Sequence, residues 1–220
     1  MVPAARLRNT ETSPPSNVAT RQLSNTRRQP TTDNAAKPQI TDMPRPTLTT
    51  ERLVLRPFTS EDAPAVQRLA GEREIALNTL LIPHPYPEGA AEEWIQGHDE
   101  NSDNHIFAIA PRNGGEVMGA IGLRVERNHD RAEIGYWLGV PYWGNGYVTE
   151  AARAMVGYAF GEVGVNRVFA CHFTRNPSSG NVLRKIGMQR EGTMRQHLVK
   201  WGEHVDVDCY GIVRDEWSGE

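Results

Sequence analysis

One stretch decides the fold of this chain: AEIGYWLGVPYWGNGYVTEAARAMVGYAFGEV, residues 132–163. Its first part, Ala132–Val140, contains many β-branched and aromatic residues and predicts a strand. Its last part repeats apolar residues at helical spacing, which predicts an amphipathic helix packed on a sheet. The apolar stripe consists of Val148, Ala151, Ala152, Met155, Val156, Ala159, Phe160 and Val163. A strand that leads directly into such a helix indicates a domain of the α/β (α+β) class.

The junction between this strand and this helix is Gly144-Asn145-Gly146-Tyr147. Glycines let main-chain N–H groups approach an anion closely, and a helix N-terminus adds free donors and the positive end of its dipole. The junction is therefore a candidate pyrophosphate site. By itself the motif is a weak signal, because a tight turn that needs positive φ also explains two glycines.

The remaining elements continue the same pattern. Strands are predicted over Glu51–Phe58, His105–Ala110, Val117–Val125 and Asn166–Phe173, with a final hairpin over Thr193–Lys200 and Val205–Val213. Helices are predicted from a cap at Ser60 to Ala70, from Pro87 to His98, and from a cap at Ser178 or Ser179 to Gly187. The segment Ile82–Pro87 contains three prolines and is expected to be a stiff loop.

Composition divides the chain into a tail and one domain. Residues 1–47 contain seven Pro, three Ser and eight Thr but no aromatic residue and no Gly, whereas residues 48–220 hold all sixteen aromatic residues. The tail is expected to be disordered or a non-native extension that precedes the true start at Met43. Its Arg-rich, acid-poor composition also fits a transit peptide or a basic arm that docks on RNA.

Charge and cysteine content narrow the function. The tail carries seven Lys or Arg and three Asp or Glu, so the rest of the chain has a net charge of −7. Such an acidic body argues against a broad nucleic-acid interface and favours cationic amine substrates. Cys171 and Cys209 form no CxxC motif, so we expect no disulfide, a reducing compartment and hence the cytoplasm. The sequence shows no metal-ligand spacing, membrane span or secretory signal.

Three separated motifs together resemble the Gcn5-related N-acetyltransferase (GNAT) superfamily, and within it the RimJ/RimL-like ribosomal-protein N-acetyltransferases. These are the opening strand TERLVLRP at residues 50–57, the strand, glycine turn and helix of residues 132–163, and NPSSGNVLRKIGM at residues 176–188. The resemblance spans about Thr49 to Trp217. It implies a mixed, mainly antiparallel sheet whose central strands splay apart around the pantetheine arm of acetyl-CoA, with flanking helices.

The resemblance also implies which residues bind acetyl-CoA, with no metal. Main-chain groups of Leu138, Gly139 and Val140 would contact the pantetheine and the thioester carbonyl. Well-placed N–H donors of this kind stabilise a developing oxyanion by roughly 3 kcal/mol each. The pyrophosphate would be held by Gly144, Asn145, Gly146 and Tyr147, and the pantetheine and sulfur would face Asn176 and Ser179.

Two departures from the family pattern matter. Pro141 stands where relatives often carry a Gln or Arg that contacts phosphate. Leu183 stands where many relatives carry a tyrosine acid that protonates the departing thiolate. The acid must therefore come from elsewhere in the chain.

The implied reaction is acetyl transfer to an amine, which is mostly protonated at neutral pH and needs a base. Glu133 is the candidate base, or a strand carboxylate that only attracts the cation. Ser179 is the candidate proton relay, or only the cap of its helix, and Tyr210 is a second candidate acid. His172, on the strand before Ser179, is expected to be packed and not catalytic.

The acceptor is less constrained by the sequence. His84, Tyr86 and Trp94 could line an amine pocket or could brace the proline-rich loop. We expect a protein N-terminal α-amine as the acceptor and a monomer or homodimer as the assembly. A polyamine, an aminoglycoside or an amino acid would also suit the acidic body, and a non-catalytic acyl-CoA-binding module is a further alternative.

Overall fold

The structure is a computed structural model that describes residues 45–100 and 102–219. The expectations for the tail, whether disordered extension, late start, transit peptide or basic arm, concern residues that lie almost wholly outside the described ones. No helix among the described residues is long and apolar enough to cross a membrane.

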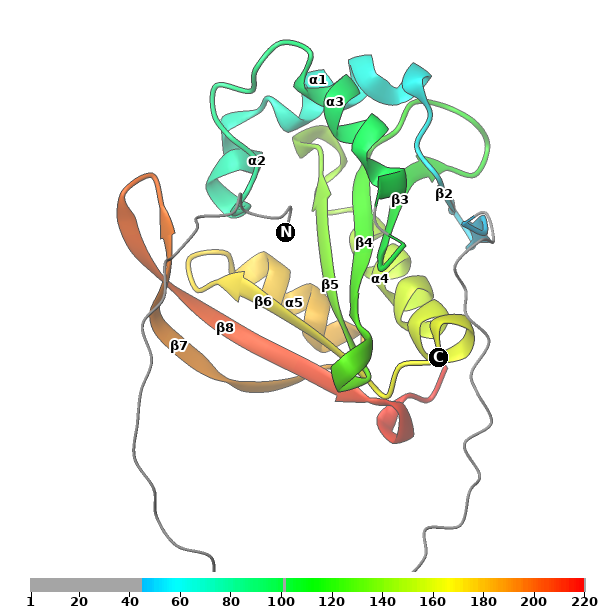
Figure 1. Ribbon diagram of the computed structural model, residues 1–220, viewed down its shortest axis with the longest axis vertical. Helices are drawn as coiled ribbons and strands as arrows, with labels where there is room; N and C mark the ends of the chain where they lie inside the picture. The colour runs from blue at the N-terminus through cyan, green and yellow to red at the C-terminus, as the bar shows by residue number, and fades with distance from the viewer. Residues whose placement is uncertain (1–44, 101, 220) are drawn as a thin grey trace, which may run out of the picture. The chain divides into compact units, whose positions relative to one another are not determined.

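Eight strands form one mixed sheet in the order β1-β2-β3-β4-β5-β6-β8-β7 (Figure 1). The strands are β1 Leu48–Thr49, β2 Leu53–Arg56, β3 Asn104–Pro111, β4 Gly119–Glu126, β5 Arg131–Leu138, β6 Arg167–Phe173, β7 Gln189–Lys200 and β8 Glu203–Val213. Every neighbouring pair is antiparallel except β5 and β6, which are parallel. The predicted fold class is confirmed.

Helices cover both faces of the sheet. They are α1 Ala63–Ala70, α2 Arg73–Asn78, α3 Ala90–Gln96, α4 Tyr147–Tyr158 and α5 Pro177–Lys185, and a π-helical turn at Ala159–Val163 extends α4. The apolar stripe of α4 packs on the strand residues that carry the main core, among them Ile121 and Ile134. On the opposite face a smaller cluster under α1 and α3 includes Trp137. The alternation of Trp137 with Leu138 along β5 explains the two layers.

The sequence placed most elements to within a few residues, and its errors have local causes. Helix α2 was missed because its six residues are too few to show a period. The first helical segment is capped at Thr59 and not at Ser60, because Asp62 Oδ2 accepts the N–H of Thr59 at 2.8 Å. Helix α5 is capped by Asn176, whose side chain accepts the N–H of Ser179.

The two parallel strands diverge soon after they meet, as the resemblance implied. The β5–β6 ladder contains only three pairs and ends at Glu133 and Phe169, although β5 runs on to Leu138 and β6 to Phe173 (Figure 1). The N–H of Gly139 donates to the carbonyl of Met118, next to β4. Because main-chain groups alternate in direction along a strand, those of Tyr136 and Leu138 point away from β4, toward the diverging β6.

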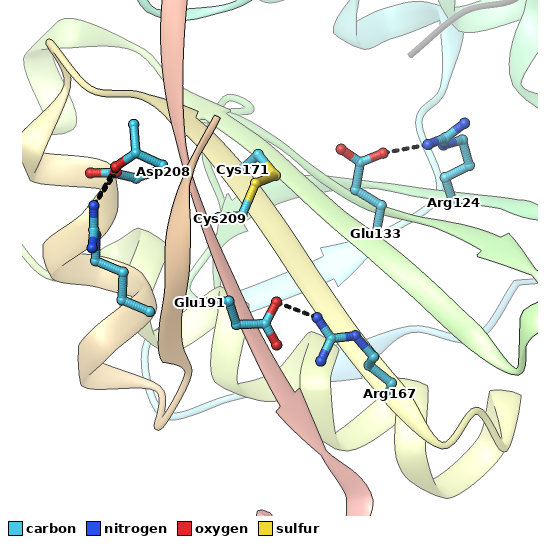
Figure 2. The surroundings of a disulfide bond; sticks show 9 residues. Arg124, Glu133, Arg167, Cys171, Glu191, Asp208 and Cys209 are labelled. Carbon is cyan, nitrogen blue, oxygen red and sulfur yellow. Dashed lines mark hydrogen bonds and ion pairs between the residues drawn. A yellow bond between two sulfur atoms is a disulfide. The ribbon is translucent and has the colours of Figure 1, made fainter. Parts of the chain in front are cut away.

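A disulfide joins β6 to β8 on the outer side of this divergence (Figure 2). Cys171 and Cys209 are directly paired residues, and their Cα atoms are 4.3 Å apart. The expectation that they form no disulfide is wrong, because they are 38 residues apart in the sequence and only the register of β6 on β8 brings them together. The argument from cysteine usage to a reducing compartment therefore loses its basis.

The close approach of β4 to the end of β5 gives a stability test. A Cβ on Gly119 would lie 2.3 Å from the carbonyl oxygen of Trp137, a main-chain atom that cannot move aside cheaply. Gly119→Ala should lower the free energy of unfolding by about 1–3 kcal/mol in urea denaturation. Gly161→Ala is the control, because nothing lies within 4 Å of a Cβ there. Equal stability of the two variants would contradict this register.

Candidate active site

The glycine turn has the backbone that an anion site requires. Gly144 and Gly146 have φ of +79° and +78°, a region that side chains disfavour, and both are exposed. Gly146 is the N-cap of α4, and no side chain caps that helix. Asn145 closes the turn, because its Nδ2 donates to the carbonyls of Tyr142 and Trp143. The first N–H groups of α4 are thus available to a bound anion.

Arg52, from the bend before β2, fixes this turn from the side. Its Nη1 donates to the carbonyl of Asn145 at 3.0 Å, and its guanidinium lies over the ring of Tyr147. In a planar trans peptide the C=O and the next N–H point in opposite directions. The bond to Asn145 therefore directs the N–H of Gly146 away from Arg52.

Glu150, in the first turn of α4, holds Arg52 in place. Its carboxylate accepts from the side chain of Thr50 and from both the main chain and Nε of Arg52. Burial acts to raise the pKa of Glu150, but these hydrogen bonds outweigh it and lower the pKa below its ordinary value. Glu150 is therefore ionised at neutral pH, and Arg52 stays beside the turn.

A surface hollow of about 880 Å³ opens next to Gly146. Its lining includes Arg52, Arg153 and Lys185, together with Glu150 and Trp217. The lining also includes Glu51, and Arg52 is paired with Glu150, so the positive charge of the hollow comes mainly from Arg153 and Lys185. Arg52 holds the turn through its bond to the carbonyl of Asn145, and Pro141 offers no side-chain contact.

Main-chain groups at the end of β5 already have partners within the chain. The carbonyl of Leu138 accepts from Trp143 Nε1 at 2.6 Å, and the N–H of Val140 donates to Glu72 Oε2 at 3.1 Å. A cosubstrate that uses the N–H of Val140 must displace Glu72. Glu72 caps α2, and the other end of α2 is bound through the carbonyl of Leu77, which accepts from Arg175 Nη2 after β6. Helix α2 is thus tied to the ends of both diverging strands.

The candidate relay Ser179 lies in the first turn of α5 and contacts β5. Its Oγ is 2.8 Å from the hydroxyl of Tyr136, and its N–H donates to Asn176 Oδ1 at 3.3 Å. Leu183, one turn further along α5, is buried in the core. Ser179 therefore lies beside the unpaired part of β5, and Asn176 caps the same helical turn.

The candidate base Glu133 lies at the closed end of the divergence. Its Oε2 accepts from Arg124 Nη2 at 2.6 Å (Figure 2). The same Nη2 of Arg124 lies 3.4 Å from Oε1 of Glu126. Gly135, two residues along β5 on the same face, is exposed, and nothing lies within 4 Å of a Cβ built there. An acceptor can therefore approach the main chain of β5 beside this carboxylate.

The second candidate acid, Tyr210, is enclosed on the other side of α5. It is 1% exposed, stacks on His172, and its hydroxyl accepts from Arg184 Nη1 at 2.8 Å. His172 is buried as well, and its Nδ1 lies 2.8 Å from the carbonyl of Phe173. A Cβ on Gly180 would lie 2.7 Å from Nε2 of His172, so this region is tightly packed.

The three residues proposed for the acceptor pocket do not form one group. Tyr86 and Trp94 both pack against the small cluster under α1 and α3 that includes Trp137, and Trp94 contacts Phe58 edge to face. Burial, together with nearby Glu92, raises the pKa of Tyr86. His84 is exposed on the proline-rich loop.

Sequence reasoning missed three residues of this site: Arg52, Glu72 and Tyr136. The first two belong to segments far from the glycine turn in the sequence, and only folding brings them to it. Tyr136 stands inside the quoted strand but carries no spacing signal that separates it from core aromatics. No cluster of metal-binding side chains occurs in the part of the chain that the structure describes.

Comparison with known proteins identifies the family of this chain. The family model described as an acetyltransferase (GNAT) domain matches residues 52–189. The chain belongs to the GNAT acetyltransferase family. The uncharacterized N-acetyltransferase YoaA of Bacillus subtilis (strain 168) is 32% identical over 172 residues, which cover 77% of this chain and 97% of YoaA.

Two further similar proteins have names that also state an acceptor. The [ribosomal protein uS5]-alanine N-acetyltransferase of Escherichia coli (strain K12) is 25% identical over 185 residues, 80% of this chain and 95% of that enzyme. The structure of the RimL ribosomal alpha-N-protein acetyltransferase in complex with coenzyme A has a TM-score of 0.69 at 21% identity and covers 76% of this chain and 97% of that one. That likeness shows the fold. This GNAT protein is an acetyl-CoA-dependent N-acetyltransferase.

The role of Arg52 in holding the turn can be tested on the enzyme. Arg52→Met removes the bond to Asn145 and the cation beside the phosphate site. The KM for acetyl-CoA should rise about five- to tenfold, the range expected for loss of an exposed charge-assisted contact, while kcat changes less than about twofold. Arg68→Met is the matched control, because Arg68 pairs only with exposed Glu116. An unaltered KM in Arg52→Met would refute this role.

Proposed function

We propose that the acceptor of this enzyme is the N-terminal α-amine of a protein, and that residues 48–220 form the catalytic domain. The observation that carries the choice of acceptor is the likeness to the uS5-alanine N-acetyltransferase along 80% of the chain. The exposed main chain at Gly135 supports it, because an extended peptide end can lie along a strand that has no side chain at that position. A ribosomal acceptor would place the enzyme in the cytoplasm.

In this proposal, acetyl-CoA supplies a thioester whose acetyl group is open to attack by an amine. The turn Gly144–Gly146, with Tyr147, binds the pyrophosphate, and Arg52 holds the turn in shape from the carbonyl side of the Asn145–Gly146 peptide. The end of β5 from Leu138 to Val140 lies along the arm. The N–H of Leu138, which points away from β4, donates to the thioester oxygen, and the N–H of Val140 contributes once Glu72 is displaced. An α-amine has a pKa near 8 and is mostly a cation at neutral pH, so the enzyme must remove a proton before attack.

Glu133 is the proposed residue for that proton. Its carboxylate is partly exposed beside Gly135, and the pair with Arg124 fixes the orientation of its oxygens. It can attract the ammonium group electrostatically and then accept its proton. On the other side of β5, Asn176 and Ser179 are proposed to face the sulfur.

A panel of acceptors tests the proposed substrate class. Thiol release from acetyl-CoA should be measured with ribosomal N-terminal peptides, spermidine, an aminoglycoside and free amino acids. The best peptide should exceed every small amine in kcat/KM by at least about tenfold, because its main chain adds contacts along β5. A higher kcat/KM for spermidine would instead favour a polyamine, which the −7 charge of residues 48–220 also suits.

The proposed base has its own test. Glu133→Gln should lower kcat by at least about tenfold, and the loss should grow as the pH falls below 8, because more of the amine is then protonated. Glu126→Gln is the matched control, since Glu126 also contacts Arg124. A loss that does not vary with pH, or no loss, would leave Glu133 with an electrostatic role only or none.

A further inference from the structure

The hydroxyl of Tyr136 contacts both the side chain and the main chain of Ser179. The oxygen of Tyr136 lies 2.8 Å from Oγ of Ser179 and 3.3 Å from its carbonyl oxygen. Tyr136 belongs to the part of β5 that has no β6 partner, and Ser179 is on the first turn of α5. The phenol therefore connects β5 to α5 beyond the point where the two central strands diverge.

The sequence does not identify the group that assists the departing thiolate, and this contact bears on that question. The resemblance implies a position on this helix where many relatives carry an acidic tyrosine, and Leu183 stands there in this chain. Tyr210 faces the same helix but is enclosed, with its hydroxyl bound to Arg184. Among the tyrosines that the structure describes, Tyr136 is the one whose hydroxyl contacts Ser179.

The direction of the hydrogen bond determines what Ser179 can do. A hydroxyl has one hydrogen to donate and can accept from others. The single hydrogen of Tyr136 can go to Oγ of Ser179 or to its carbonyl oxygen, and Oγ is nearer, at 2.8 Å against 3.3 Å. Because a phenol is also a stronger acid than an aliphatic hydroxyl, we take Tyr136 as the donor and Ser179 Oγ as the acceptor. Once Tyr136 donates to Oγ, the hydrogen of Ser179 is free for a third group.

We propose that Tyr136 is a positioning residue, which donates to Ser179 so that the hydroxyl of Ser179 points at the sulfur of the departing thiolate. The proposal rests on the role given above to Ser179, but not on which amine is the acceptor. The helix-cap bond from the N–H of Ser179 to Asn176 fixes the first turn of α5, so only the hydroxyl remains to be oriented.

The pKa values decide between a hydrogen bond and a full proton transfer. Burial raises the pKa of Tyr136 to about 12, against the lowering effect of its bond to Ser179. An ordinary thiol has a pKa of about 8.5, so a thiolate would not take the proton of this phenol at equilibrium. The pair therefore stabilises the thiolate by donating hydrogen bonds.

The step balances without another reactant. The nitrogen–carbon bond forms, the carbon–sulfur bond breaks, and its electron pair leaves on the sulfur. The nitrogen loses one proton before attack and a second after the nitrogen–carbon bond has formed. Both protons pass to solvent through the base proposed above, and the thiolate takes up a proton from solvent after release. Tyr136 and Ser179 end the step with their own protons.

The test compares Tyr136→Phe, Ser179→Ala, Ser179→Thr and the double variants of Tyr136→Phe with each. The first readout is kcat with the best acceptor found for the native enzyme. The second needs no turnover: the ratio of the dissociation constants of CoA and desulfo-CoA, which lacks the sulfur, by calorimetry at pH 8. Tyr158→Phe is the matched control, because it removes a buried hydroxyl whose hydrogen-bond partner within residues 45–100 and 102–219 is His105, far from α5 in the sequence.

Tyr136→Phe should lower kcat about tenfold, leave acetyl-CoA affinity within about twofold, and reduce the preference for CoA over desulfo-CoA. Tyr136→Phe should lower kcat by the same factor in the Ser179→Thr variant, where a hydroxyl remains. It should cause no further fall in kcat in the Ser179→Ala variant. Tyr158→Phe should change neither readout.

Three outcomes would overturn the proposal. One is native kcat and native CoA preference in Tyr136→Phe. Another is a full additional loss when Tyr136→Phe is combined with Ser179→Ala. The third is a parallel fall of acetyl-CoA affinity and unfolding temperature, which would show that the hydroxyl only supports the core. The CoA readout needs no acceptor, so failure of the peptide assay leaves this test intact.

Discussion

The parallel contact between β5 and β6 is short, and the rest of the site depends on its early end. β5 is held along its full length by eight pairs with β4, and β6 by seven pairs with β8. Since each strand follows its antiparallel partner, the two separate after three pairs. Beyond the third pair, the main-chain groups of β5 that face β6 have no partner on that strand. In an acetyltransferase such groups can bind the arm of the cosubstrate.

Two helices begin at the open end of this divergence, one after each strand. α4 follows β5 directly and presents its uncapped N-terminus at the glycine turn, where Arg52 and Glu150 fix the peptide groups. α5 follows β6 and presents Ser179 to Tyr136. The proposed phosphate site and the proposed sulfur site therefore lie at the starts of two helices, each of which follows one of the two diverging strands.

The sequence predicted those features that depend on residues close together in the chain. The apolar period of α4, the strand alternation of β5 and the glycine turn were all readable, because each depends on residues a few positions apart. The contacts of Arg52 with Asn145, of Glu72 with Val140 and of Cys171 with Cys209 join segments 38 to 93 residues apart. They follow from sheet order and helix placement, which no spacing in a single sequence encodes.

A crystal structure of the protein with coenzyme A bound is the most direct test of the central claim. The account predicts that the diphosphate lies on the turn Gly144–Gly146, that the arm runs between β5 and β6 beyond Glu133 and Phe169, and that the sulfur lies on the side of Ser179. Strands β5 and β6 paired along their whole length, with coenzyme A bound elsewhere, would contradict it.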